Sequence, residues 1–271
     1  MKARRLPSRL RQETRTPALS AIPRAAALWA LWLLGMWAIA SVAPLLLDSP
    51  SMPGVVQEGF LWLLRSWDYG RYAQIVARGY LEDGVEPNYA FYPLWPLILS
   101  IGSSVAPLAV VAGALAVPAS LAAFLGVALL NPDGHVQRTI VALICFPGSF
   151  ALALWYPDSL ALATAAWACL LALRGHVAAA ALLGAVTGAL RPDGILLALP
   201  LFALGRRDGR RGAQLLALAP VAGAAAANAF FWIRSGAPLA TARAQDQFQR
   251  NGPADLPAEV LRIFEPCAPA W

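Results

Sequence analysis

The residues whose types best suit chemistry lie in a polar, aromatic stretch where Trp67 and Asp68 are followed by Tyr72. A carboxylate beside an apolar, aromatic wall is partly desolvated, which suits it to accept a proton from a hydroxyl group. We therefore predict that Asp68 is a general base. The alternative is a solvated loop acid that pairs with Arg65 or Arg71, or that caps the helix that follows.

Asp68, Arg71 and Tyr72 are spaced at i, i+3 and i+4, so a helix would place all three on one face. Such a face offers a carboxylate, a guanidinium and a phenol, and a guanidinium matches phosphate oxygens in a bidentate arrangement. The spacing predicts a site for a sugar or a phosphate. The alternative is a surface ion pair between Asp68 and Arg71, which would contribute little. Further substrate-binding candidates in this stretch are Trp67, Tyr80 and Tyr92.

Two later turns carry the remaining candidates. Asp158 lies in the sequence Tyr-Pro-Asp-Ser, and Arg191 and Asp193 lie in Arg-Pro-Asp-Gly. Ionisable residues at the ends of apolar segments are functional candidates by default, so we predict that all three bind substrate. The alternatives are that Asp158 only caps its helix and that Arg191 and Asp193 only pair with each other.

The elements that must position these residues are apolar helices. The chain is 59% hydrophobic and 13% charged, whereas soluble domains carry about 25% charged residues. The runs 25–47 and 108–130 have no charged residue and exceed the about 20 residues that a spanning helix needs. Further apolar runs are 139–156, 159–173, 177–190, 195–204 and 213–233. We predict an all-α, polytopic integral membrane protein with about seven transmembrane helices.

The distribution of Lys and Arg predicts the orientation. Residues 1–24 are strongly basic, as is the cluster at 206–211, so both are expected in the cytoplasm. The transmembrane domain would cover 25–233, with a large extracytoplasmic first loop at 48–92, an interfacial segment at 93–107 and an extracytoplasmic C-terminal segment at 234–271. The stretch that contains Asp68 and the two later turns then all lie on the outer side of the membrane. The simplest such membrane is the bacterial plasma membrane.

Several chemistries lack support in the sequence. It contains no Gly-rich phosphate loop, no H-E-x-x-H and no G-x-S-x-G. Cys145, Cys169 and Cys267 do not have metal-binding spacing. We predict neither a cofactor nor a metal site, although a need for a divalent cation is left open. The net charge of +6 is explained by basic residues at membrane edges, and no nucleic-acid partner is expected.

The first stretch, from Trp67-Asp68 through Tyr72 and Gly79-Tyr80 to Ala90-Phe91-Tyr92-Pro93-Leu94-Trp95-Pro96, resembles a known signature. It is the W-D…Y…A…G-Y…A-F-F-P-L-Y-P pattern of the PIG-V-like mannosyltransferases of the GT-C superfamily, which include GPI mannosyltransferase 2. The turn that begins at Tyr156 resembles the family's Y-T/S-E-S-L-F turn, and Leu190-Arg191-Pro192-Asp193-Gly194 resembles its T-R-P/S-x-G turn. The resemblance runs in collinear order from about Trp67 to Pro200.

The resemblance implies a polyprenyl-phosphate sugar donor, a glycolipid or glycan acceptor, inversion at the anomeric carbon, and Asp68 as the base. Arg71 or Arg191 would hold the donor phosphate, and the lipid tail would lie between helices. The sequence departs from the pattern at Asp158, where the family has Glu, and at Pro157. Family members are expected to continue with further helices after Trp271, so we expect a fragment or a shortened member.

The alternative function is a transporter or flippase of lipid-linked sugars, which would also use interrupted helices. A transporter needs polar groups near the middle of the membrane. Here the candidate residues gather at the outer helix ends, and the polar residues inside the last apolar run are Gln214 and Asn228. This placement favours the transferase.

Overall fold

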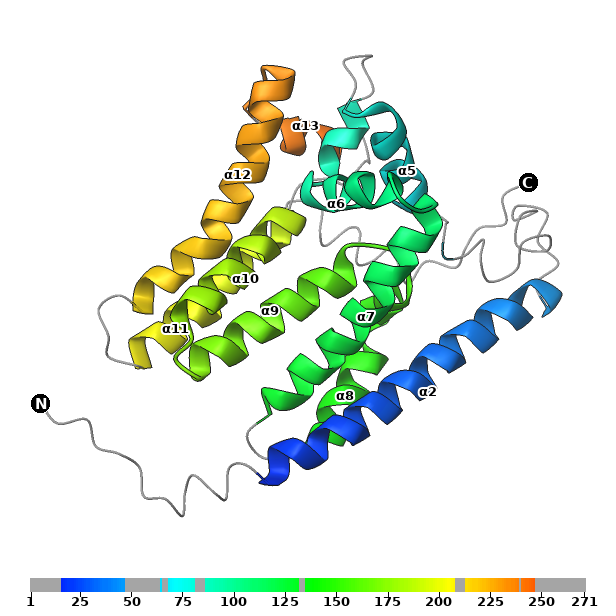
Figure 1. The fold of residues 1–271 in the computed structure, drawn as a ribbon, viewed down its shortest axis with the longest axis vertical. Coiled ribbons are helices and arrows are strands. Elements are labelled where there is room, and N and C mark those ends of the chain that lie inside the picture. The colour runs from blue at the N-terminus through cyan, green and yellow to red at the C-terminus, as the bar shows by residue number, and fades with distance from the viewer. Residues whose placement is uncertain are drawn as a thin grey trace, which may run out of the picture. The chain divides into compact units, whose positions relative to one another are not determined.

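The computed structural model describes residues 16–46, 64, 68–80, 86–131, 135–207, 213–238 and 240–246. Every regular element within these ranges is helical, which confirms the all-α prediction (Figure 1). The chain divides into two compact units. Unit 1 takes the chain up to Gly79 and from Tyr92 to Ala227, and unit 2 takes Tyr80–Phe91 and the chain from Asn228 onward.

Unit 1 contains most of the helices. Its α-helices are α2 (Thr16–Leu46), α5 (Asp68–Arg78), α6 (Leu94–Ser103), α7 (Leu108–Leu129), α8 (Val136–Cys145), α9 (Asp158–Leu173), α10 (Val177–Leu190), α11 (Ala198–Arg207) and the first part of α12 (Leu218–Ser235). Its 3₁₀ helices are η2 (Pro147–Ala153), η3 (Pro192–Leu197) and η4 (Ala213–Ala217). Unit 2 contains η1 (Glu86–Ala90), the rest of α12 and α13 (Ala240–Asp246).

Three stretches of helix are long and apolar enough to cross a membrane: Ala21–Val42, Leu108–Leu129 and Gln214–Ser235. The bent pair α8–η2 would make a fourth if it is one span. The predicted count of seven is therefore not met by the described helices. The physical reason is length: α9 has 16 residues and α10 has 14. At about 1.5 Å per residue, both fall short of a core about 30 Å thick.

The run 139–156, predicted as one apolar helix, is broken in the structure. α8 ends at Cys145, and η2 leaves it at an angle of 94°. Pro147 explains the break, because proline has no backbone N–H to continue the helical ladder. The hydroxyl of Ser149 donates to the carbonyl of Ile144 at 2.8 Å, so one carbonyl at the break keeps a partner.

α7 packs against α2 and α9 through aromatic residues and a glycine. The ring centroids of Trp32 and Phe124 are 5.1 Å apart, and the indole N–H of Trp29 donates to the hydroxyl of Ser120 at 3.0 Å. On the α9 side, a Cβ added at Gly126 would lie 2.8 Å from the Cβ of Ala166. These contacts hold α9, and hence its first residue, in a defined place on α7.

α10 approaches the start of α12 so closely that only glycine fits. A Cβ at Gly188 would lie 2.0 Å from the carbonyl oxygen of Pro220, and one at Gly223 would lie 1.9 Å from that of Ala185. Small residues allow such backbone contact between helices that share a membrane. The C-terminal half of α10, which precedes the Arg191 turn, is therefore in close backbone contact with α12.

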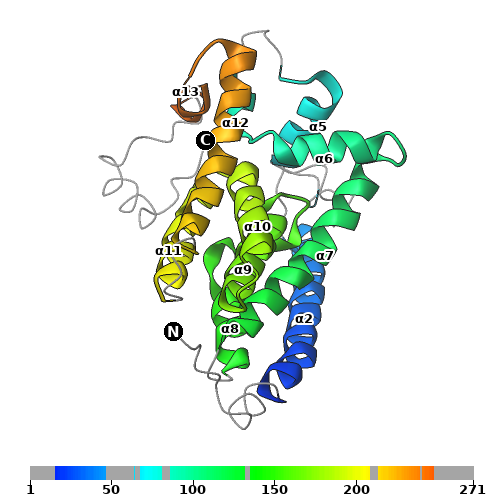
Figure 2. The ribbon, with the colours of Figure 1, turned by 60° about the vertical axis from the view of Figure 1, so that its left-hand side comes forward.

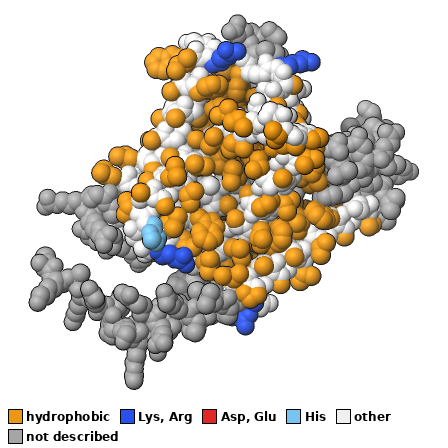
Figure 3. Space-filling view, in the orientation of Figure 1, with side chains coloured by type: hydrophobic (Ala, Val, Ile, Leu, Met, Phe, Trp, Pro, Cys, Tyr) orange, Lys and Arg blue, Asp and Glu red, His pale blue; other side chains and the backbone are white. Residues whose placement is uncertain are grey.

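The outer surfaces of the helices are apolar. Large hydrophobic side chains are widely exposed, among them Leu31 (68%), Leu182 (66%) and Leu199 (71%). Figure 3 shows hydrophobic side chains over most of the visible helical surface. Extended exposed apolar surface marks contact with a membrane or with another protein. Together with the long apolar helices, it supports the predicted membrane association.

Candidate functional site

The turn between α9 and α10 determines which helix ends meet. Gly175 adopts a left-handed conformation with φ +80°, and the N–H of His176 donates to the carbonyl of Leu171 at 2.9 Å, which ends α9. α10 then runs back along α9, and the two helices lie side by side in Figures 1 and 2. The end of α10 is thereby returned to the start of α9, which brings Arg191 beside Asp158.

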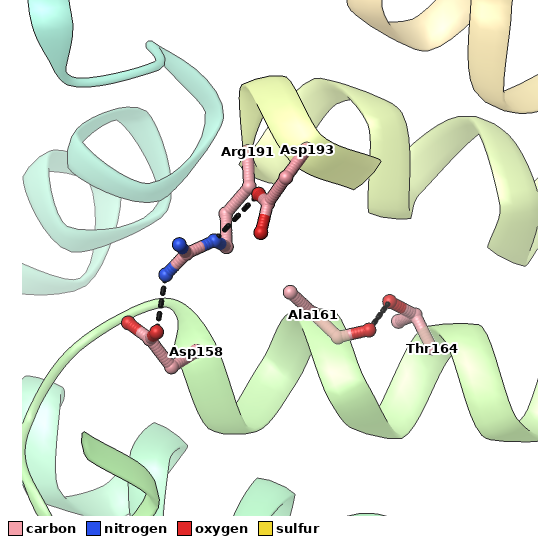
Figure 4. Close-up of polar contacts among 5 residues, drawn as sticks. All are labelled: Asp158, Ala161, Thr164, Arg191 and Asp193. Atoms are coloured by element: carbon pink, nitrogen blue, oxygen red, sulfur yellow. Dashed lines mark hydrogen bonds and ion pairs between the residues drawn. The ribbon is translucent and has the colours of Figure 1, made fainter. Parts of the chain in front are cut away.

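Arg191 is the centre of the polar cluster. It is extended (φ −148°, ψ 145°) between α10 and η3, as expected for a residue before a proline. Its Nη1 is ion-paired with Oδ1 of Asp158, and its Nε donates to Oδ1 of Asp193 at 2.8 Å (Figure 4). One guanidinium therefore joins the start of α9 to η3.

Burial sets the electrostatics of this cluster. The side chains of Asp158 and Arg191 are only 23% and 35% exposed. Burial raises the pKa of Asp158 above its usual value; the positive charge of Arg191 opposes the shift, whereas the charges of Asp193 and Asp68 add to it. Burial alone would lower the pKa of Arg191, but the carboxylates of Asp158 and Asp193 outweigh burial and raise it. The guanidinium thus keeps its charge.

Tyr156 connects this cluster to α5. Burial raises the pKa of Tyr156, and the charges of Asp68 and Asp158 raise it further, while a hydrogen bond with the backbone of Asp68 acts in the opposite direction. The rings of Tyr69 and Trp155 make an edge contact at the same junction, with centroids 5.9 Å apart. The start of α5, which carries Asp68, is therefore held next to the start of α9.

α5 brings further predicted residues to the same place. It begins at Asp68 and is helical, which meets the condition under which the i, i+3, i+4 spacing places Asp68, Arg71 and Tyr72 on one face. Tyr72 is buried and lies close enough to Arg191 to raise the pKa of its guanidinium. The side chain of Asp68 is exposed, although the sequence predicted an apolar surrounding for it, and Arg71 is half-buried.

A cavity of about 690 Å³ lies beside the cluster, within the about 300–1,000 Å³ typical of ligand sites. Its polar lining comes from Asp158, Arg191, Asp193, Thr187 and Ser149. The hydroxyl of Thr187 is 2.8 Å from that of Thr164. The apolar lining includes Leu143, Phe146, Phe150, Leu162, Leu196 and Leu197. A charged group at one place and apolar walls elsewhere suit an amphipathic molecule.

The structure thus brings Asp68, Tyr72, Asp158, Arg191 and Asp193 into one neighbourhood of unit 1. Tyr92 is buried in unit 1, and Trp67 lies outside the described residues. Tyr80 belongs to unit 2, where its hydroxyl donates to the carbonyl of Phe91 at 2.6 Å and its ring packs on Phe231. These contacts fix its position within unit 2, and its predicted role in substrate binding stays a prediction.

The alternatives for the turns are settled in part. Arg191 and Asp193 do pair, but Arg191 also pairs with Asp158, which the sequence analysis did not anticipate. Asp158 is the first residue of α9, and Pro157 occupies the N-cap position without a side-chain cap. Asp158 therefore does not act as the N-cap, although a carboxylate in the first turn suits the helix dipole.

The sequence did not predict Tyr156, Thr187 or the cavity as parts of the site. Tyr156 belongs to a turn that the sequence analysis did single out, and its position directly before Pro157 and Asp158 could have suggested a shared role. Thr187 is an isolated hydroxyl in an apolar helix and carries no comparable signal.

Within the described ranges, no group of three or more His, Cys, Asp and Glu side chains could hold a metal ion. Comparisons with known protein families, with curated proteins and with solved structures found no match to this chain. The geometry of the site is therefore the basis on which its chemistry is interpreted.

Proposed function

We propose that this chain is an integral-membrane glycosyltransferase of the PIG-V-like, GT-C type. It would move a sugar, with mannose as the first candidate, from a polyprenyl-phosphate donor to a hydroxyl of a glycolipid or glycan acceptor. The observation that carries the proposal is the meeting of Asp68, Arg191 and an apolar cavity in one part of unit 1. A donor of this class has a phosphate, a sugar and a long apolar chain, and the site offers a partner for each.

The roles follow from the chemistry of an inverting transfer. The acceptor oxygen attacks the anomeric carbon from the face opposite the leaving group, and the bond from that carbon to the phosphate oxygen breaks. The electron pair of that bond goes to the phosphate, and the hydroxyl proton goes to the carboxylate of Asp68. Asp68 is exposed, so an acceptor can reach it from water. Arg191 stabilises the negative charge on the leaving phosphate.

Tyr72 and Tyr156 would support these two groups. Tyr72 is buried near Arg191, and Tyr156 holds the backbone of Asp68. Burial raises the pKa of Tyr156, so its phenol keeps its proton in the neutral range. The hydroxyls of Tyr72 and Tyr156 can each act as a hydrogen-bond donor to a sugar or phosphate oxygen. Substrate binding would also involve Trp67, Arg71 and Tyr92 from the predicted first loop. Asp193 would act on the substrate indirectly, through its hydrogen bond with Arg191.

The placement of charge favours transfer over transport. In the apolar helices α7, α9 and α10, the only charged residue is Asp158, and it is the first residue of α9. A transporter would need such groups near the midpoint of a helix. An extracytoplasmic site, a cytoplasmic N-terminus and a bacterial plasma membrane are part of the same proposal, and they rest on the distribution of basic residues.

The deciding experiment uses the full chain in liposomes with radiolabelled polyprenyl-phosphate-mannose and a mixture of glycolipid acceptors. Transfer of the label to a new product, lost in Asp68→Asn, would support the proposal. If the label crosses the bilayer while still attached to its lipid and no product forms, the chain is a flippase. If neither occurs with mannosyl, glucosyl or other hexosyl donors, the proposed function is wrong.

A further inference from the structure

Two carboxylates contact the guanidinium of Arg191, and the nitrogens that they engage differ in their number of hydrogens. Nε carries one hydrogen, which it donates to Oδ1 of Asp193 at 2.8 Å. Nη1 carries two, so its ion pair with Asp158 leaves it a further donor. A guanidinium binds phosphate in a bidentate way along its Nε–Nη2 edge or its Nη1–Nη2 edge. A phosphate can therefore take the Nε–Nη2 edge only in exchange for Asp193, whereas Asp158 can keep its place.

The two carboxylates also differ in their exposure to water. The side chain of Asp193 is 60% exposed, and that of Asp158 is 23% exposed. A water-exposed ion pair shifts an equilibrium by at most about fivefold, whereas removing one partner of a buried pair costs about a hundredfold or more. Release of Asp193 is therefore the easier of the two, because water already solvates most of its carboxylate.

The turn that carries Asp193 can release the carboxylate without a movement of the backbone. The N–H of Gly194 donates to the carbonyl of Arg191 at 3.1 Å, and a Cβ added at Gly194 would lie 2.3 Å from the carbonyl oxygen of Thr187. The backbone next to Asp193 is therefore held against α10. Asp193 reaches the guanidinium from η3, and Asp158 reaches it from α9 (Figure 4). A rotation of the Asp193 side chain alone frees Nε, while Asp158 keeps Arg191 in position.

The balance of charge favours the Nε–Nη2 edge over the other one. On the Nη1–Nη2 edge a phosphate would share Nη1 with Asp158, and one guanidinium would then face three anions. On the Nε–Nη2 edge the phosphate replaces an anion, so the guanidinium still faces two. Asp193 lines the cavity of about 690 Å³. A headgroup in its place therefore leaves an attached hydrocarbon chain next to the apolar lining of that cavity.

We propose that a phosphodiester headgroup binds the Nε–Nη2 edge of Arg191 by exchange with the carboxylate of Asp193, which turns into water while Asp158 stays in place. This inference rests on the proposed function for the identity of the ligand as an isoprenoid phosphodiester. One negative charge leaves the guanidinium and one arrives, and no covalent bond or proton is transferred. Asp193 is thus a positioning residue that holds Arg191 before the ligand binds and competes with other anions for the same edge.

Two substitutions of Asp193 test the exchange. Asp193→Asn leaves Nε a neutral acceptor, and Asp193→Ala leaves it none. Titration calorimetry of the full chain in nanodiscs measures the Kd of the methyl diester of farnesyl phosphate, which has one fixed negative charge at neutral pH. We expect about two- to fivefold tighter binding by Asp193→Asn than by wild type, the effect of losing an exposed ion pair. Asp193→Ala should bind about twofold more tightly again, because the phosphate no longer displaces a hydrogen bond.

A matched control separates exchange from a general loss of negative charge. Asp68 is an exposed acid whose charge also acts on Asp158, so Asp68→Asn removes one charge from the same neighbourhood. Equal tightening by Asp68→Asn and Asp193→Asn would show that loss of charge is enough, and so would equal affinities of the two Asp193 variants. Weaker binding by Asp193→Ala than by wild type would mean that Asp193 orients Arg191 for the ligand. Each of these results would overturn the exchange.

Inorganic phosphate distinguishes a lipid ligand from a free anion. It lacks the chain that the apolar lining would contact, so it should displace the diester only at a much higher concentration. Displacement at equal concentration would overturn the assignment of the ligand as an isoprenoid phosphodiester. An absence of diester binding in all of these proteins would refute the exchange outright.

The exchange and the proposed function can fail separately. Both variants should fold, because Asp193 is exposed, and thermal unfolding in the same nanodiscs checks this. Sugar transfer by a chain whose diester affinity is the same in wild type and both variants would remove only the exchange. The expected order of affinities without transfer to any acceptor would remove only the proposed function.

Discussion

The guanidinium of Arg191 is ion-paired with the carboxylate of Asp158, which lies 33 positions earlier in the chain. The pair joins the end of α10 to the start of α9, and the N–H groups at a helix start favour the carboxylate that Arg191 contacts. Because Tyr156 ties the same helix start to Asp68, three segments that are far apart in sequence share one electrostatic environment.

The first prediction concerns Asp68. Asp68→Asn preserves size and removes the basic oxygen, so the rate of sugar transfer should fall by about 10²–10⁴-fold if Asp68 is the base. The measurement is initial-rate transfer in liposomes, together with donor binding by calorimetry. Donor binding should be retained, because Arg191, the proposed partner of the donor phosphate, is held by Asp158 and Asp193. A transfer rate within a few-fold of wild type would remove Asp68 from the base role.

The second prediction concerns Arg191. Arg191→Lys keeps one positive charge but loses the planar fork that binds phosphate at two points. Donor affinity should fall by about 10- to 100-fold, the effect of losing a charge-assisted hydrogen bond of about 1.5–3 kcal/mol. Arg78→Lys, at the exposed end of α5, is the matched control. Equal donor affinity in the two variants would leave Arg191 with a purely structural role.

The third prediction concerns the contact between α10 and α12. Gly188→Ala would push a methyl group to within 2.0 Å of the carbonyl oxygen of Pro220, so the helices must separate. We expect a loss of about 1–3 kcal/mol, as for other overpacked positions. Gly35→Ala in α2 has open space around it and should be neutral or stabilising by up to about 1 kcal/mol. Thermal unfolding in one detergent compares them, and equal melting temperatures would show that the close contact is not maintained.

The fourth prediction concerns the two hydroxyls between α9 and α10. Thr164 and Thr187 are both buried, and their hydroxyl oxygens are 2.8 Å apart. Thr164→Val, Thr187→Val and the double variant form a cycle that isolates their interaction. We expect a coupling of about 0.6 kcal/mol, the average for such bonds in membranes. Each hydroxyl also lies within hydrogen-bond distance of a carbonyl of its own helix, Leu160 and Leu183 respectively. A hydroxyl has one proton, so the threonine that donates to the other gives up its bond to its own helix. A coupling of zero would mean that both threonines donate within their own helices.

The fifth prediction concerns topology. The charge distribution predicts residue 104 outside and residue 176 inside, and both are exposed at helix ends. With the three native cysteines replaced, Ser104→Cys should react with a membrane-impermeant maleimide in intact cells, whereas His176→Cys should react only after the cells are opened. Labelling of both positions in intact cells would contradict the predicted orientation.

Much of the architecture was predictable because it depends on uninterrupted apolar runs. The run 108–130 predicted α7 to within one residue, since its long apolar sequence outweighs Pro118 and the two glycines within it. The break after Cys145 was missed, although Pro147-Gly148 is a strong breaker signal in the sequence. The prediction of one helix followed the apolar character of the run. In the structure the helix ends before Pro147, because proline has no N–H to donate to the helical ladder. α2 also begins at Thr16, within the segment predicted to be a cytoplasmic tail.

The sequence predicted which residues form the site better than it predicted which of them contact one another. The alternation of turns predicted that Asp68, Asp158 and Arg191 share one side, because helices that run back and forth return every second turn to the same side. The pairing of Arg191 with Asp158, and the contact of Tyr156 with Asp68, depend on the rotation of each helix about its axis. That rotation is set by packing details such as Gly126 against Ala166, which no local pattern encodes.

The shortness of α9 and α10 has a consequence for the lipid around the protein. Helices of about 21–24 Å, at about 1.5 Å per residue, cannot match a hydrocarbon layer about 30 Å thick. Such a mismatch is relieved by local thinning of the bilayer or by tilting, at a cost of a fraction of a kcal/mol per Å. If α9 and α10 lie across the bilayer, thinning would bring the aqueous boundary inward toward Asp158 and Arg191. The acyl-chain length of the surrounding lipids would then help to set the depth at which these two groups meet water.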